Sequence, residues 1–187
     1  MLNRRTLLLL LSGLPLVGLS GCGGSRGDSA ANCSPRPFAA DESCAVCGMT
    51  IVEYPGPKGQ VCVDDGNRSV GFCSTSDLFA WVLQPENATR IRQAYVHDLM
   101  QTEWEQPDDS ALIVARKAHF VIGDPRMASM GPALVPFGER DAAKAHADEL
   151  EEGRVLTYDD IDWDVLNDLT QSMIDQQHHN GGGHHGH

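Results

Sequence analysis

Positive charge is scarce in this chain. Its 187 residues carry 14 Lys and Arg against 26 Asp and Glu, which gives a formal net charge of −12 at pH 7. Because nucleic acids and anionic lipid headgroups bind basic surfaces, both are poor partners for such an acidic surface. Charge therefore argues against the nucleic-acid-binding classes, and we expect no nucleic-acid partner.

The chain also lacks the residue patterns of the common enzyme classes. It has no recognisable Ser/His/Asp arrangement, no glycine-rich loop of the kind that holds phosphates, and no clear acid and base pair. We therefore expect a binding protein and not an enzyme. The rival enzyme classes are a thiol-disulfide oxidoreductase and a lyase that acts on a metal-carbon bond.

Long apolar runs are missing as well, because the run over residues 7–19 is too short to span a bilayer. It follows two arginines and precedes "LSGC", which ends at Cys22 and is typical of a bacterial lipoprotein signal peptide. We expect cleavage after residue 21, acylation of Cys22 and a lipid-anchored periplasmic protein. Gly23 offers no acidic retention signal, so we expect the outer membrane rather than the inner. The mature chain would carry 12 basic against 26 acidic residues, a net charge of −14.

The rest of the chain divides by composition into three parts. Residues 22–40 are small, polar and proline-containing, which predicts that a flexible tether follows the acylated cysteine. Residues 41–170 form the predicted folded domain, with halves at about 41–105 and 106–165. Five of the eight histidines fall among glycines in the last ten residues. Residues 171–187 therefore predict a disordered tail that binds divalent metals loosely.

Within the domain, short apolar runs alternate with two helical patterns. In the first half, "TIVEY", "QVCVD" and "SVGFC" predict strands, residues 74–84 predict an amphipathic helix, and "QAYVHDL" predicts a further strand. In the second half, "ALIVA", "HFVIG" and "ALVPF" predict strands, residues 139–151 a helix, and "RVLTYDD" a closing strand. The shared order predicts an α+β fold built from two related β-β-α-β-like units.

Cysteine is the residue type with the most chemical content. Besides the expected lipid site, the mature chain holds Cys33, Cys44, Cys47, Cys62 and Cys73. Five is an odd number for an oxidising compartment. At least one thiol should therefore be free, paired with another chain or bound to metal.

The motif "CAVCGM" over residues 44–49 allows several readings. A structural zinc site would need a second close pair, whereas Cys62 and Cys73 are separated by ten residues. A thioredoxin-like redox pair should follow a strand and open a helix, whereas this pair precedes the strand-like "TIVEY". A plain disulfide between Cys44 and Cys47 stays open.

A soft metal ion accounts for the methionine of this motif as well as for the two cysteines. Cu(I) prefers thiolate and thioether sulfur, and a turn at Gly48 would bring Met49 to the same ion as Cys47. The alternative is that Met49 fills a gap in the core, as methionines often do.

Three further residues are candidate ligands with structural alternatives. Cys73 directly precedes the first helix, whose N-terminus would stabilise a thiolate, or it is a small buried hydrophobe. Met130 lies in the loop "MASMGP", which has few apolar neighbours and suits reversible copper capture. His97 ends a predicted strand, where it is either a ligand or a hydrogen-bonded structural histidine.

Taken together, "CAVCGM", "YPGPKGQ", "FCSTSDLFAWVLQPEN", "YVHDL", "MGPALVPF" and "GRVLTYDD" resemble the NosL family, the copper-chaperone lipoproteins associated with nitrous oxide reductase. The resemblance covers nearly all of residues 41–160 in order. It implies a fold distantly similar to organomercurial lyase and a Cu(I)-binding periplasmic lipoprotein. The implied task is delivery of copper to the catalytic copper-sulfide centre of the reductase, through a membrane-associated maturation complex.

The family resemblance also implies a ligand set. Carried over residue by residue, the family segments fall on Cys44, Cys47, Met49, Cys73, His97 and Met130. A lipoprotein for general copper resistance would use the same ligands and is the alternative function within the copper-binding class.

Overall fold

The computed structural model describes residues 33–64 and 66–181. The predicted signal peptide and Cys22 lie outside the described residues, and so do the last six residues of the predicted tail. Within the described part of the chain, no helix has the length and apolar character needed to cross a membrane.

The first half of the domain is built on a four-stranded antiparallel sheet. Its strands and helix are β1 (Gly59–Val63), β2 (Arg68–Phe72), α1 (Thr75–Val82), β3 (Ile91–His97) and β4 (Leu112–Val114). The assignment of "ALIVA" to the second half is wrong, because this segment pairs with the first sheet as its edge strand. The strand order is β2-β1-β3-β4, so β1 is central and pairs with both β2 and β3. All five residues of β1 are buried, as expected for a strand covered on both faces.

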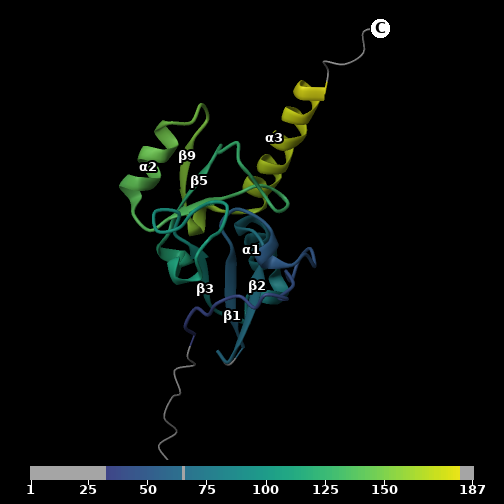
Figure 1. The fold of residues 1–187 in the computed structure, drawn as a ribbon, viewed down its shortest axis with the longest axis vertical. Helices are drawn as coiled ribbons and strands as arrows, with labels where there is room; N and C mark the ends of the chain where they lie inside the picture. The colour runs from purple at the N-terminus through teal and green to yellow at the C-terminus, as the bar shows by residue number, and fades with distance from the viewer. Residues whose placement is uncertain (1–32, 65, 182–187) are drawn as a thin grey trace, which may run out of the picture.

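The second half repeats this arrangement. Its strands and helix are β5 (His119–Ile122), β8 (Val135–Phe137), α2 (Arg140–Asp148) and β9 (Arg154–Thr157), with strand order β8-β5-β9. In both halves the first strand is central, its hairpin partner lies on one side, and the strand after the helix lies on the other. The predicted α+β fold of two β-β-α-β-like units is therefore confirmed (Figure 1).

A small hairpin interrupts the second half between β5 and β8. It consists of β6 (Met127–Ala128) and β7 (Gly131–Pro132), paired antiparallel, with Ser129 and Met130 at its turn. The hairpin is held over α1 because the Ser76 hydroxyl donates a hydrogen bond to the Pro132 carbonyl at 2.9 Å.

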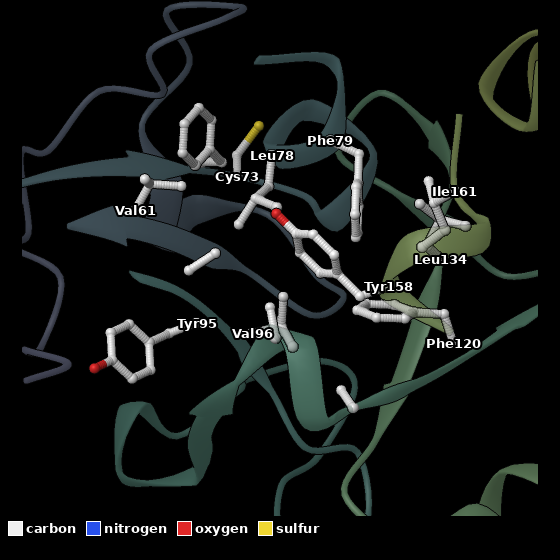
Figure 2. Close-up of a cluster of buried hydrophobic side chains, with 14 of the residues drawn as sticks. Val61, Cys73, Leu78, Phe79, Tyr95, Val96, Phe120, Leu134, Tyr158 and Ile161 are labelled. Carbon is white, nitrogen blue, oxygen red and sulfur yellow. The ribbon is translucent and has the colours of Figure 1, made fainter. Parts of the chain in front are cut away.

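The helix α1 joins the two halves through its apolar face. It begins where the Ser74 side chain accepts a hydrogen bond from the Asp77 backbone N–H at 3.0 Å. Phe79 then packs against Phe120 and Tyr158 of the second half, with ring centroids 5.2 and 5.1 Å apart. Figure 2 shows these rings in one buried cluster that both halves share.

A third helix, α3 (Trp163–Gly181), was not expected from the sequence. Asp162 caps it by accepting a hydrogen bond from the Val165 backbone N–H at 3.0 Å. Leu166 and Leu169 are buried against the core, which supplies the packing that a short isolated helix lacks. The prediction of a disordered tail is therefore wrong for residues 171–181, which continue this helix (Figure 1).

The predicted tether is also wrong at its C-terminal end. A disulfide joins Cys33 to Cys62 of β1, and the Arg36 backbone N–H donates to the Gln60 side chain at 3.1 Å. Phe38 is buried in the main core. Residues 33–40 therefore belong to the folded domain, because a covalent bond and apolar burial offset the entropy of ordering this polar segment.

The segment "TIVEY" is not a strand. It forms a 3-10 turn over Ile51–Glu53, in which only Ile51 is buried. The Ile51 backbone N–H donates a hydrogen bond to the Glu42 carbonyl at 2.9 Å, and Thr50 forms an isolated antiparallel β-bridge with Ser43. The backbone groups of Thr50 and Ile51 thus close a local loop with residues 42 and 43 instead of extending a sheet.

Candidate metal centre

Three thiols and one carboxylate meet at the N-terminal end of α1. The ligand atoms of Cys44, Cys47, Cys73 and Asp77 all lie within 4.8 Å of one another. The two sulfurs of Cys47 and Cys73 are 3.3 Å apart. Cys44 and Cys73 are buried, whereas Cys47 is half-buried and gives the group an accessible edge. We call this group the thiol cluster.

The first two cysteines reach the cluster through a tight turn. The Gly48 backbone N–H donates to the Cys44 carbonyl at 3.0 Å, and the Cys44 N–H donates to the Met49 carbonyl at 2.8 Å. Gly48 has φ +76°, a conformation that L side chains rarely adopt, so the glycine permits the turn. The Ala45 N–H bonds to the Gly71 carbonyl at 3.0 Å and fastens the turn to β2 beside Cys73.

The other two members come from the junction of β2 and α1. Cys73 directly precedes Ser74, the residue that caps α1, and Asp77 lies in the first turn of that helix. The Cys73 thiol donates to Asp77 Oδ2 at 3.1 Å, and the Cys44 sulfur lies 3.4 Å from the same oxygen. In Figure 2 the Cys73 sulfur lies at the edge of the apolar cluster and is directed away from Tyr95 and Val96. From the hairpin, the Ser129 hydroxyl donates to the same sulfur at 2.9 Å.

The close packing of the cluster gives its three thiols different pKa values. Hydrogen bonding to Cys73 lowers the pKa of the Cys44 thiol to about 4, while the same interaction and burial raise the pKa of Cys73. Burial also raises the pKa of Cys47 and that of the Asp77 carboxyl. Within the cluster, Cys44 is therefore the thiol that loses its proton most easily, and Cys73 is the one that loses it least easily.

The structure separates the cysteines into two kinds. Cys33 and Cys62 form a disulfide, and the free cysteines of the described residues are Cys44, Cys47 and Cys73. The odd count is thus explained by one structural disulfide and three thiols in one place. The alternative of a disulfide within "CAVCGM" does not occur.

Two of the predicted ligands that are not cysteines are methionines, and they lie in different positions. Met130 lies on the hairpin turn beside Ser129, and its side chain is 55% exposed. Met49 is half-buried, and its carbonyl closes the turn of the motif. The roles of both thioethers stay predictions.

The structure does not bring His97 to the thiol cluster. Its ring is fully buried, Nδ1 accepts a hydrogen bond from the Lys58 backbone N–H at 3.0 Å, and Nε2 lies 3.2 Å from Asp109 Oδ1. Both ring nitrogens therefore have protein partners, which is the geometry of the structural alternative for this histidine.

Sequence reasoning missed Asp77 as a member of the metal-binding group. In the sequence, Asp77 is an acidic residue near the start of the predicted helix, where acidic residues are favoured by the helix dipole. The available signal was that Asp77 follows Cys73 closely, in the first turn of the helix that Ser74 caps.

Comparison with known proteins agrees with the motif-based resemblance. The family model named NosL matches residues 35–166. The copper-binding lipoprotein NosL of Stutzerimonas stutzeri is 40% identical over 178 residues, which cover 95% of this chain and 88% of the relative. The protein of the same name from Achromobacter cycloclastes is 34% identical over 174 residues, which cover 91% and 84%.

A solved structure shares the fold as well. The crystal structure of the copper chaperone NosL from Shewanella denitrificans matches with a TM-score of 0.66 and 34% identity, over 70% of this chain and 96% of that one. The family model and both relatives span most of the sequence, including all four members of the thiol cluster. This chain belongs to the NosL family.

Proposed function

We propose that this protein is a lipid-anchored copper chaperone that holds one Cu(I) ion in the thiol cluster and delivers it to nitrous oxide reductase. The observation that carries the proposal is the convergence of three free thiols and one carboxylate within 4.8 Å. The relatives named as copper-binding lipoproteins and the copper chaperone with the same fold support the class of cargo.

The donor set favours a soft monovalent ion. Thiolate sulfur selects Cu(I), and thiolates also bind zinc, but structural zinc sites commonly include four Cys or His ligands. Within the described residues the cluster offers three thiols and no imidazole. Cu(I) binding would replace thiol protons, and the Asp77 carboxyl oxygen lies within hydrogen-bonding distance of two of these sulfurs.

The cluster is built for exchange as well as for retention. Two of its cysteines are buried and keep the ion away from solvent, while Cys47 is half-buried at the open edge. A recipient can therefore replace the ligands one at a time, beginning at Cys47. Val46 and Met130 are 44% and 55% exposed near this edge, and we place the docking surface for the recipient there.

Delivery to the reductase is tested in a strain that lacks this gene. Under limiting copper we expect reductase without its catalytic copper-sulfide centre and unchanged copper tolerance. Metal content of the purified reductase and growth on graded copper measure the two effects. Complementation with a Met100→Leu variant should restore loading, because Met100 is exposed and lies outside the cluster.

Two other outcomes favour the rival functions. Normal loading of the reductase together with heightened copper sensitivity would favour general copper resistance. Catalytic turnover of a disulfide substrate by the reduced protein, without stoichiometric copper binding, would favour a thiol-disulfide oxidoreductase.

Anchoring rests on Cys22 and a short connection to the fold. The domain begins at the Cys33–Cys62 disulfide, so ten residues separate Cys33 from the proposed lipid site. Two or three acyl chains on Cys22 would hold the protein durably to a membrane. Mass spectrometry should find an acylated N-terminal Cys22, and fractionation should place it in the outer membrane. An unmodified N-terminus after residue 22 would contradict this.

A further inference from the structure

A cavity of about 260 Å³ lies beside the thiol cluster, between α1, the β6-β7 hairpin and α3. Asp77 of the cluster lines one side of it, Met130 of the hairpin a second, and Met173 of α3 a third. The cavity thus brings a cluster member and two thioethers from separate parts of the chain to one space.

The two methionines line the same cavity, and the hairpin turn lies against the sulfur of Met173. A methyl group added to Gly131 would lie 3.2 Å from Met173 Sδ, so this sulfur rests against the residue that follows Met130. Gly131 has φ +130°, which L side chains rarely adopt. The glycine therefore lets the hairpin turn approach α3 and its thioether closely.

The hairpin is also fixed to the thiol cluster. Ser129, directly before Met130, donates to the Cys73 sulfur at 2.9 Å, and Ser76 holds the Pro132 carbonyl at 2.9 Å. A turn held at both ends keeps Met130 between the cluster on one side and Met173 on the other.

We propose that Met130 and Met173 form an outer Cu(I) station, a thioether pair through which the ion enters and leaves the thiol cluster. This inference rests on the proposed function. Thioethers are soft donors that suit Cu(I), but they are neutral and release no proton on binding, so they hold the ion more weakly than thiolates. An ion captured at this pair, of which Met130 is exposed, would then move inward to the stronger thiolate ligands.

The alternative is that Met173 only fills space beneath the hairpin. Methionine often does so, because its flexible side chain adapts to irregular gaps. If Met173 only fills space, its methyl resonance should not shift when a soft ion is added. If Met173 is a ligand, that resonance should shift. The two roles can therefore be separated without any substitution.

The first test uses the reduced domain with ¹³C-labelled methionine methyl groups and Ag(I) as a redox-inert substitute for Cu(I). Beyond one equivalent, we expect the Met130 and Met173 methyl resonances to shift together. Those of Met100 and Met127, exposed methionines that do not line this cavity, should stay in place. An unshifted Met173 methyl overturns the outer station.

The second test measures the rate at which Cu(I) passes from the protein to a chromogenic chelator. Met173→Leu keeps the side-chain volume and removes the donor sulfur. We expect transfer to slow about 10-fold, the lower end of what loss of a supporting group costs at a metal site, with equilibrium affinity within about 2-fold. Met100→Leu is the matched control.

The two proposals fail in distinguishable ways. Equal transfer rates in Met173→Leu and Met100→Leu overturn the outer station while leaving the thiol cluster as the Cu(I) site. Failure of the unsubstituted protein to bind Cu(I) through its cysteines, read from thiolate-to-copper absorption, overturns the proposed function itself.

Discussion

Replacing Cys73 with serine should weaken Cu(I) binding by more than about 100-fold, the upper end of what loss of a supporting group costs at a metal site. Cys73 is central to the cluster, because its sulfur lies 3.3 Å from that of Cys47 and 3.1 Å from Asp77 Oδ2. Serine keeps the shape but replaces a soft sulfur with a hard oxygen. Anaerobic competition with a Cu(I) chelator measures the affinity of the reduced domain.

Two variants serve as controls for the loss of the thiol. Ser129→Ala removes the hydroxyl that touches the same sulfur without removing a proposed thiolate ligand. His97→Gln perturbs the fully buried histidine that lies outside the cluster, so it should lower stability and leave affinity within about 2-fold. A Cys73→Ser variant that binds Cu(I) as tightly as the parent would exclude this thiol as a ligand.

Removing the Cys33–Cys62 disulfide should lower the free energy of unfolding by about 3–4 kcal/mol, as expected from loop-closure entropy. The bond spans a sequence separation of 29 residues and joins the N-terminal segment to central strand β1. The Tyr95 hydroxyl also donates to the Cys33 carbonyl, a hydrogen bond that the substitution of the two cysteines does not itself remove. Urea unfolding of a Cys33→Ala/Cys62→Ala variant measures the loss.

Metal binding separates the structural role of this disulfide from a role in the cluster. Cu(I) affinity of the double variant should stay within about 2-fold of the parent under conditions where it is folded, because the three free thiols are unchanged. A change in unfolding free energy below about 1 kcal/mol would contradict the entropic account. A matching loss of Cu(I) affinity would show that the disulfide supports the cluster.

Local patterns explain why much of the fold was predictable. The segments "QVCVD", "SVGFC" and "HFVIG" overlap β1, β2 and β5, because each is a short apolar run that a sheet buries. The helix after Ser74 was predictable for the same reason, since its cap and apolar face both lie within a few residues. The repeat of β-β-α-β order then followed from the sequence of these elements.

Long-range contacts explain what the sequence left open. The pairing of Cys33 with Cys62 could not be predicted, because composition alone made residues 33–40 look like a tether. Helix α3 was missed because its stability depends on burial of Leu166 and Leu169 against the core. The tail's histidines and glycines dominated the local pattern and concealed the start of that helix.

The candidate metal centre likewise has features that the sequence predicts and features that depend on long-range contacts. The sequence by itself determined that Cys44, Cys47 and Cys73 were candidate ligands, because thiols are rare and their chemistry is independent of the fold. Only the tertiary structure decided that Asp77 joins them, that His97 is held by Lys58 and Asp109, and that the remaining two cysteines pair. Which side chains meet depends on how β2, α1 and the hairpin pack, and that packing is a property of the whole chain and of no single motif.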